Sequence, residues 1–183
     1  MGFTSIYFKN IFRESHIYAF EPDMKAFHIL EKNIKYRNLK DISIFNVAVT
    51  DKKGEIDFFT NETVGLQMSI NEKRSNVKKT TVNTISLSEF IKNNNLHIDI
   101  LKIDIEGAET IVFRDLYKNN CLNKINEILI EYHHNIEESP NHLSEFLQMI
   151  ENSGFDYQIS SNYLNKNKPK EFQDISIHAY KKI

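Results

Sequence analysis

The stretch Leu101-Lys102-Ile103-Asp104-Ile105-Glu106-Gly107-Ala108-Glu109 decides the fold of this chain. It continues an apolar run, 98–103, typical of a strand buried on both faces of a parallel sheet. Two carboxylates and a glycine end the run, and residues 108–117 then have a helical pattern. Open α/β folds have this layout and bind ligands at the carboxyl ends of their strands. We therefore expect Asp104 and Glu106 at a ligand-binding edge, with ordinary turn and helix-capping roles as the alternative.

The composition indicates a single domain, residues 1–183, and narrows the range of functions. The 23 basic and 25 acidic residues give a net charge of −2, whereas a nucleic-acid-binding surface needs basic residues in excess or clustered on one face. No run of about 18 apolar residues is present, so we expect no membrane span. Because Cys121 is the only cysteine, we expect no disulfide framework and a reducing, cytoplasmic location.

Hydrophobic periodicity predicts helices that alternate with strands. The expected helices cover 3–12, 26–38, 108–117 and 140–152, and a short one begins at Ser86, which has capping-box spacing with Glu89. The expected strands cover 16–20, 42–49, 55–60, 80–85, 98–103, 125–132, 155–160 and 175–180. The first half of this order implies right-handed crossovers between parallel strands, and the last two strands read as an antiparallel pair.

Polar residues follow four successive core strands of this pattern. They are Glu21, Asn46-Val47-Ala48, Asp104 with Glu106, and the segment from Glu131 to His134. Because ligands of open α/β sheets bind at the carboxyl ends of the strands, we interpret the four signals as one site rather than as unrelated turns.

Among these four candidates, Glu21 has the most specific expected role. A carboxylate at the end of the second strand of a nucleotide-binding unit accepts hydrogen bonds from both ribose hydroxyls, because it offers two acceptor oxygens. The alternative is a helix-start carboxylate beside Pro22. The triplet Asn46-Val47-Ala48 is placed to flank an adenine ring, with an ordinary strand end as its alternative.

Four segments together resemble a known family. They are Ala19-Phe20-Glu21-Pro22-Asp23, Asn46-Val47-Ala48-Val49 with Asp51-Lys52-Lys53-Gly54-Glu55, Lys102 to Glu109, and Glu131-Tyr132-His133. They resemble the FkbM family of S-adenosylmethionine-dependent methyltransferases, many of which act on hydroxyl groups of sugars, lipids or polyketide-type products. The resemblance extends from Gly2 to about Tyr180. It implies a Rossmann-like (class I methyltransferase) α/β fold: a mostly parallel sheet, helices on both faces and an antiparallel C-terminal strand pair.

The resemblance also implies S-adenosylmethionine as cofactor, a small-molecule or glycan acceptor, and roles for single residues. Glu21 binds the cofactor ribose, Asn46, Val47 and Ala48 line its adenine, and Gly2 lies in the tail of a cofactor-binding turn. Asp104 lies beside the transferred methyl group, and Glu106 and His133 are expected to contact the acceptor.

Methyl transfer to a hydroxyl needs a positioned acceptor and benefits from a base. Asp104 is the first candidate base and His133 the second, since a neutral imidazole can accept a proton. The alternative for His133 is a hydrogen-bonded structural group. The pair His133-His134, with Glu131 or Glu106, could in principle hold a divalent metal. We expect no metal, because adjacent histidines of a strand point to opposite faces, which disfavours both binding one ion.

One departure from the family is large. The family opens with a strand that ends in a glycine-rich Asp-x-Gly-Ala-Asn-x-Gly turn, and Met1-Gly2-Phe3-Thr4-Ser5 resembles only its tail. The missing first strand would lie centrally, between the strands 16–20 and 98–103, and its absence removes ladder hydrogen bonds from both. We expect a fragment of a longer enzyme, with a shortened relative that has lost or weakened cofactor binding as the alternative.

Three functions from different classes follow. The leading hypothesis is an S-adenosylmethionine-dependent O-methyltransferase. The second is a truncated or degenerate methyltransferase-like domain that acts as a binding or adaptor module, favoured by the missing strand. The third, a nicotinamide-dependent oxidoreductase, would share Glu21 but needs a glycine fingerprint ahead of the first helix.

Overall fold

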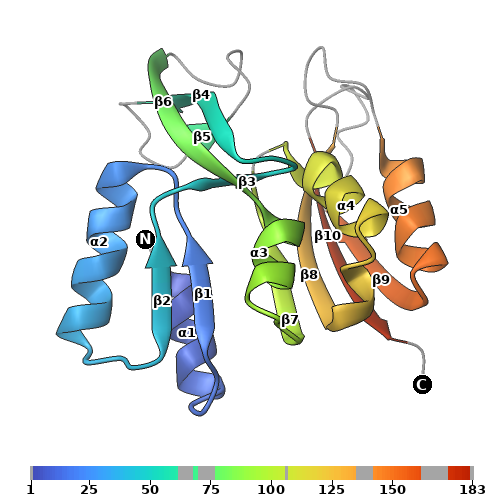
Figure 1. Ribbon diagram of the computed structural model, residues 1–183, viewed down its shortest axis with the longest axis horizontal. Coiled ribbons are helices and arrows are strands. Elements are labelled where there is room, and N and C mark those ends of the chain that lie inside the picture. Colours follow the sequence, from blue (N-terminus) through green and yellow to red (C-terminus); the bar gives the residue numbers. More distant parts are fainter. Residues whose placement is uncertain are drawn as a thin grey trace.

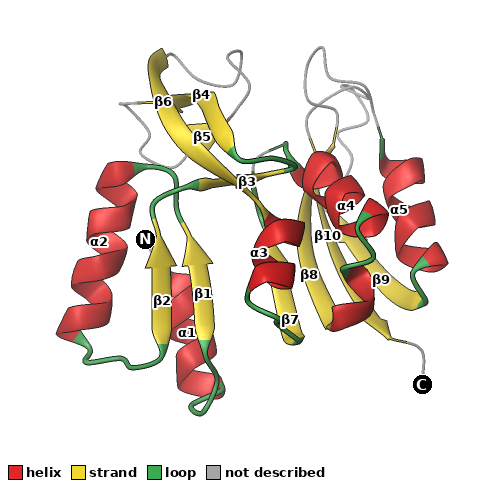
Figure 2. Cartoon of the chain, in the orientation of Figure 1, coloured by secondary structure: helices red, strands yellow, loops and turns green. Residues whose placement is uncertain are grey.

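The computed structural model describes residues 2–61, 68–69, 77–105, 107–134, 142–161 and 173–181 (Figure 1). The helices are α1 Phe3–Ile11, α2 Met24–Tyr36, α3 Leu87–Asn93, α4 Glu109–Lys118, α5 Leu143–Asn152 and a 3-10 turn Leu122–Lys124. The strands are β1 Ile17–Phe20, β2 Ile42–Phe45, β3 Ala48–Thr50, β4 Gly54–Asn61, β5 Met68–Ser69, β6 Val77–Ser86, β7 Ile98–Ile103, β8 Ile125–His134, β9 Phe155–Ser161 and β10 Gln173–Lys181. This order confirms the expected mixed α/β class (Figure 2).

The described strands form three sheets. One pairs β1 with β2, the second has the order β7-β8-β10-β9, and the third has the order β3-β6-β4-β5. The pairs β1–β2, β7–β8 and β3–β6 are parallel, and β10 runs antiparallel to β8 and β9. The antiparallel pair at the end of the chain is therefore confirmed. In Figure 1, α4 and α5 lie in front of the second sheet, while α1 contacts β1 from behind.

The main sheet is interrupted between β1 and β7. Within the described residues each of these strands is the outermost of its own sheet, and no described strand pairs with both. The interruption coincides with the place at which the sequence resemblance puts the missing first strand. Both strands therefore present one edge whose N–H and C=O groups have no ladder partner among the described strands.

Aromatic packing joins β1 and β2 to the rest of the molecule across this interruption. Phe20 of β1 and Phe45 of β2 stack with their ring centroids 5.2 Å apart. Phe90 of α3 meets both rings edge-on, at 5.2 Å and 5.4 Å, and also meets Tyr18 at 5.5 Å. Edge-to-face contacts of this kind add stability beyond the area that they bury. Phe90 thus packs α3 against β1 and β2, and Phe20 also packs against the main core cluster.

The expected strand 42–49 is in fact two strands in different sheets, which corrects the sequence prediction. β2 ends at Phe45 and pairs with β1, whereas β3 begins at Ala48 and pairs with β6. The break lies at Asn46, whose side-chain amide donates hydrogen bonds to the carbonyl oxygens of Glu21 and Pro22. These bonds tie the chain to the turn after β1 and redirect it out of the first sheet.

The hydrophobic core lies between the second sheet and the helices α4 and α5. Phe113 of α4 and Phe146 of α5 are fully buried, with ring centroids 4.5 Å apart. Isoleucines of β8 and β10 face them, including Ile128 and Ile177. The apolar run 98–103, from which the fold was predicted, forms β7 beside this core.

A buried carboxylate fixes α3 to α4. Asp115 of α4 accepts hydrogen bonds from the hydroxyl of Ser86 at 2.9 Å and from both the hydroxyl and backbone N–H of Ser88, at 2.9 Å and 3.2 Å. Ser86 is also the N-cap of α3, accepting from the Glu89 N–H, so the helix start expected at Ser86 is confirmed. A negative charge beside this helix start is favourable because the helix N-terminus carries a partial positive charge.

Replacing Asp115 with asparagine should lower the free energy of unfolding by about 2 kcal/mol, since hydrogen bonds to a charged group are lost and buried donors remain. Urea unfolding of the variant and the parent chain measures the difference. The control is Asp57→Asn, which breaks an exposed ion pair with Lys79 and should cost less than about 1 kcal/mol. Equal losses in the two variants would show that the buried hydrogen bonds of Asp115 stabilise the chain no more than the exposed ion pair does.

Candidate active site

The polar residues expected at one sheet edge do follow the strands as predicted. Glu21 comes directly after β1, Asn46 after β2 and Asp104 after β7. His133 is the residue before the last one of β8. Figure 1 places the carboxyl ends of β1, β2 and β8 on the same side of the molecule. The structure joins these residues in two groups, Glu21 with Asn46 and Asp104 with His133, on either side of the interruption between β1 and β7.

Glu21 is half-buried at the end of β1. Its backbone N–H donates to the Phe45 carbonyl oxygen at 3.0 Å, and its carboxylate Oε1 accepts the backbone N–H of Asp23 at 3.0 Å. Burial raises the pKa of Glu21, the Asp23 N–H opposes this, and the Asp23 charge adds to it. The cap of α2 is Asp23, which accepts the Ala26 N–H at 2.7 Å. Glu21 therefore does not serve as the helix cap.

Asn46 holds the Glu21 turn in place. Its side-chain nitrogen donates to Glu21 O at 2.9 Å and to Pro22 O at 3.1 Å, which uses both of its N–H groups. Only the side-chain carbonyl of Asn46 is then available to read a ligand. Val47 is half-buried in the bend that follows, and Ala48 is buried at the start of β3.

Gly2 begins α1 in the left-handed conformation, with φ 78°. A Cβ at this position would lie 2.5 Å from Leu30 Cδ1 of α2, so the glycine allows the start of α1 to approach α2 closely. Any larger residue would also strain the backbone there. The structure gives Gly2 a packing role at the start of α1, and its cofactor role stays a prediction.

Asp104 is the first residue after β7 and is exposed. Its Oδ2 lies 2.8 Å from the ammonium group of Lys102, two residues earlier on the strand. Glu106, the other carboxylate of this turn, lies outside the described residues. Gly107 follows with φ 104°, a conformation that favours glycine, and its N–H donates to Glu109 Oε1 at 2.9 Å.

His133 belongs to a buried pair that sequence reasoning did not identify. Its Nδ1 lies 2.6 Å from Glu109 Oε1, and the two side chains are 3% and 2% exposed. On the other side of the ring, Nε2 lies 3.8 Å from Asp174 Oδ1 of β10. The Nδ1 atom of His133 therefore has the hydrogen-bonded structural role that was the alternative interpretation. The Nε2 atom instead faces the carboxylate of Asp174.

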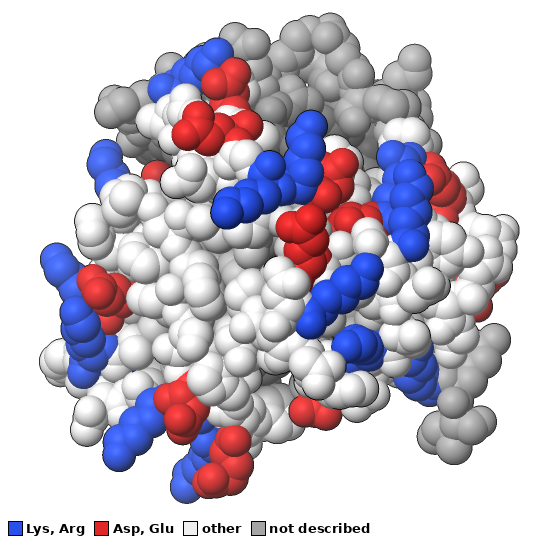
Figure 3. Space-filling model, viewed as in Figure 1, with Lys and Arg blue, Asp and Glu red and all other residues white. Residues whose placement is uncertain are grey.

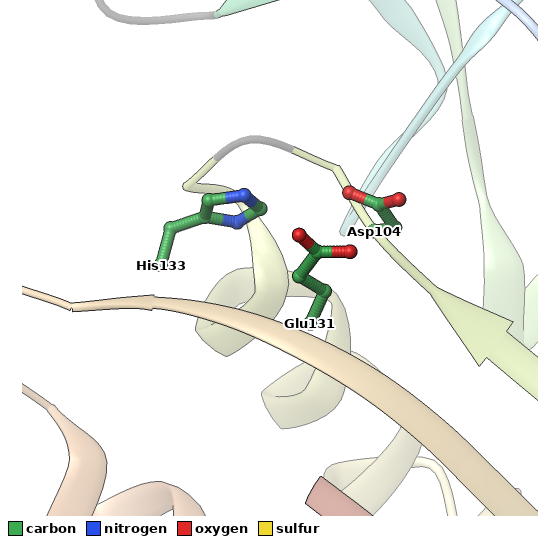
Figure 4. Close-up of side chains that lie close together, drawn as sticks. All are labelled: Asp104, Glu131 and His133. Carbon is green, nitrogen blue, oxygen red and sulfur yellow. The ribbon is translucent and has the colours of Figure 1, made fainter. Parts of the chain in front are cut away.

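Glu131 joins this arrangement from the same strand. Residues two apart on a strand share a face, so Glu131 and His133 point to the same side of β8. Figure 4 shows their side chains converging with that of Asp104. One ligand atom from each lies within 4.8 Å of the others. Burial raises the pKa of Glu131, and the nearby charge of Asp104 raises it further.

Two members of the site were missed for an identifiable reason. Glu109 stands in the most specific motif but reads from sequence as an ordinary first-turn helix carboxylate. Asp174 is placed opposite His133 only by the antiparallel register of β10 on β8, a contact between segments 41 residues apart. The alternating strand pattern of 173–181 contains several polar residues, so no local signal marks Asp174.

Two further features of the described residues are the charge distribution on one face and the character of the helices. On the face shown in Figure 3, positive and negative side chains of the described residues are interspersed, without a basic patch suited to nucleic acid. Among the described helices, none combines the length and the apolar character that crossing a membrane requires.

Comparison with known proteins identifies the family. The sequence matches the methyltransferase FkbM domain over residues 2–157. No curated protein matches it. A similar solved structure is methyltransferase FkbM from Methylobacillus flagellatus KT, with a TM-score of 0.60 and 13% identity, covering 98% of this chain and 41% of that one. Another is precorrin-6y C5,15-methyltransferase from Geobacter metallireducens GS-15, with a TM-score of 0.50, 10% identity and coverage of 97% and 73%.

The fold and the family match define a domain of the methyltransferase class. The chain belongs to the FkbM methyltransferase family, as the strand-end segments predicted. At sequence identities of 13% and 10%, the two solved structures support the fold alone. The chain spans about two-fifths of the length of the first of them (41%).

Proposed function

We propose that this chain is a domain of an S-adenosylmethionine-dependent methyltransferase that methylates a hydroxyl group of a sugar, lipid or secondary metabolite. The observation that carries the proposal is the fixed position of Glu21, held at a sheet edge by backbone bonds and by Asn46. The site fits the nucleoside part of the cofactor, because Glu21 Oε2 and the Asn46 carbonyl are acceptors for hydroxyl and amino groups. When bound, the cofactor supplies an electrophilic methyl group on a sulfonium.

The residues of this chain would act on the acceptor in two ways. Asp104, exposed after β7, would accept the proton of the acceptor hydroxyl when that hydroxyl takes up the methyl group that the cofactor supplies. His133 is the second candidate base, and it shares with Glu106 the proposed role of contacting the acceptor. Positioning the acceptor hydroxyl for transfer would provide much of the rate acceleration.

One observation favours a second candidate, a non-catalytic binding module. The interruption between β1 and β7 separates Glu21 from Asp104, so the described part of the chain does not form one continuous ligand edge. Thermal unfolding with and without S-adenosylhomocysteine distinguishes the two functions. Ligand at about 100 times its dissociation constant should add roughly 2.7 kcal/mol of stability, and no shift in a cooperatively folding chain favours the binding module.

Replacing Glu21 with alanine should weaken S-adenosylhomocysteine binding by about tenfold to a hundredfold, the loss expected for hydrogen bonds from ribose hydroxyls to a charged acceptor. Isothermal titration measures the dissociation constant. Because burial raises the pKa of Glu21, the parent affinity should also fall as pH decreases through that raised value, and this dependence should vanish in the variant. A carboxylate accepts hydrogen bonds from ribose hydroxyls more strongly when it is ionised than when it is protonated.

The matched control is Glu31→Ala, which removes an exposed carboxylate of α2 that pairs with Lys35. This variant should bind S-adenosylhomocysteine like the parent chain. An unchanged dissociation constant in Glu21→Ala would remove Glu21 from the cofactor site.

A further inference from the structure

Three side chains from two neighbouring strands converge on one point beside the proposed acceptor position. Asp104 extends from the end of β7, and Glu131 and His133 from one face of β8 (Figure 4). Each offers a ligand atom, and the three atoms lie within 4.8 Å of one another. Two ligands that bind one ion at about 2.1 Å are at most about 4.2 Å apart, so a side-chain movement of about half an ångström closes the set.

We propose that Asp104, Glu131 and His133 bind a divalent metal ion. The sequence expectation of no metal considered both histidines, His133 and His134, with Glu131 or Glu106, and rested on adjacent strand residues pointing to opposite faces. The structure forms a different set, because Glu131 is two residues from His133 and shares its face. The third ligand comes from the neighbouring parallel strand, which sequence spacing alone does not reveal.

The orientation of the imidazole supports this assignment. Nδ1 of His133 lies 2.6 Å from Glu109 Oε1, and an ionised carboxylate only accepts hydrogen bonds, so Nδ1 carries the proton and Nε2 has the lone pair. A histidine that binds a metal commonly donates its other N–H to a carboxylate in this manner, which fixes the ring and raises the basicity of the ligand. We assign Nε2 of His133 to the ion.

Asp174 provides a second and independent observation. Its Oδ1 is buried, has no hydrogen-bond partner within the described part of the chain, and lies 3.8 Å from His133 Nε2. A buried carboxylate oxygen in this position is costly unless a cation or a proton donor compensates it. An ion bound to Nε2 would lie close enough to attract it.

The local charge balance also favours a cation. Asp104, Glu131 and Asp174 are three carboxylates in one neighbourhood, and within the described part of the chain the Lys102 ammonium group pairs with Asp104 at 2.8 Å. Lys102 therefore competes with a metal for Asp104. A dication would supply twice the charge of the ammonium group at the centre of the carboxylates.

The donor set and the surroundings indicate which ions fit. One imidazole with two carboxylates suits Mn²⁺ or Zn²⁺ better than Mg²⁺ or Ca²⁺, which prefer oxygen ligands alone. Glu131 and Lys102 also line a surface hollow of about 340 Å³, bordered by Gln158, Ser160 and Ser176, which gives an ion and its water ligands a route from solvent. If the proposed methyl transfer is correct, the ion would hold the acceptor oxygen beside Asp104, but its binding does not depend on the cofactor.

The test is titration of the cofactor-free chain with Mn²⁺, following free Mn²⁺ by electron paramagnetic resonance. We expect saturable binding of a single ion per chain. Glu131→Gln should weaken binding by at least about tenfold, as for the loss of metal-site residues in general. Glu127→Gln, which removes an exposed carboxylate of the same strand, should bind Mn²⁺ like the parent. Lys102→Met should bind more tightly, because it removes the competing ammonium group.

Cooperative urea unfolding of each variant shows that the variant is folded, so that its Mn²⁺ affinity can be compared with that of the parent chain. Absence of saturable binding in the folded parent, or equal binding by Glu131→Gln and the parent, overturns the metal site. Mn²⁺ binding without a thermal shift by S-adenosylhomocysteine would leave the metal site standing while the proposed methyl transfer fails. A thermal shift by S-adenosylhomocysteine without Mn²⁺ binding would have the opposite meaning.

Discussion

Glu109→Ala should lower the free energy of unfolding by about 3–5 kcal/mol, because a charged acceptor is removed and two buried donors, His133 Nδ1–H and the Gly107 N–H, lose it. Glu109 and His133 are the most deeply buried ionisable pair among the described residues, at 2% and 3% exposed. The carboxylate Oε1 of Glu109 is 2.6 Å from His133 Nδ1 and also accepts the Gly107 N–H at 2.9 Å. Its removal therefore affects both the imidazole and the turn after β7.

Thermal and urea unfolding measure this loss. For a chain of this size, each kcal/mol lowers the melting temperature by about 2–4 °C, so we expect a decrease of roughly 10 °C or more. The control is Glu145→Ala, which breaks the exposed pair between Glu145 of α5 and Arg114 of α4. Exposed pairs contribute about 0–1 kcal/mol, so the control should unfold almost like the parent.

A loss below about 1 kcal/mol in Glu109→Ala would contradict the buried pair, because exposed pairs already account for changes of that size. Glu109→Gln separates charge from shape, since it keeps an acceptor for Gly107 but removes the negative charge from His133. Most of the loss should persist in this variant if the charge is what stabilises the imidazole. If Glu109→Gln is as stable as the parent, the interaction is an ordinary neutral hydrogen bond.

The sequence predicted the elements well because their patterns are local. The run 98–103 forms β7 at the expected bounds, and the capping-box spacing of Ser86 and Glu89 begins α3. Apolar periodicity and caps are properties of a few consecutive residues, so they can be read without a structure. The strand expected over 42–49 failed because its break depends on Asn46 bonding to a turn 24 or 25 residues earlier.

The site was predicted only as far as strand ends determine it. Glu21 and Asp104 follow directly from their strands, and both lie where the pattern placed them. The contact of His133 with Glu109 and Asp174 depends on sheet order and antiparallel register, which join segments far apart in the chain. No local pattern encodes such pairs, so the buried network and the three side chains that we propose to bind a metal became visible only in three dimensions.

Asp104→Asn should reduce the turnover number by about 10²–10⁴-fold if Asp104 accepts the proton of the acceptor hydroxyl. Asparagine keeps the size of the side chain but cannot take up a proton, so the loss belongs to the chemical step. Stability should change little, because Asp104 is exposed and its ion pair with Lys102 contributes at most about 1 kcal/mol. The measurement is S-adenosylhomocysteine formation with an acceptor found by screening hydroxylated sugars and lipids.

The control is Asp99→Asn, which removes an exposed carboxylate near the opposite end of β7 and should leave turnover unchanged. Binding of S-adenosylhomocysteine should be retained by both variants, which separates a loss of chemistry from a loss of cofactor. Adding saturating Mn²⁺ then distinguishes two actions of Asp104. A turnover that recovers with the ion identifies Asp104 as a metal ligand, a turnover that stays low identifies it as the base, and full turnover without added metal excludes both.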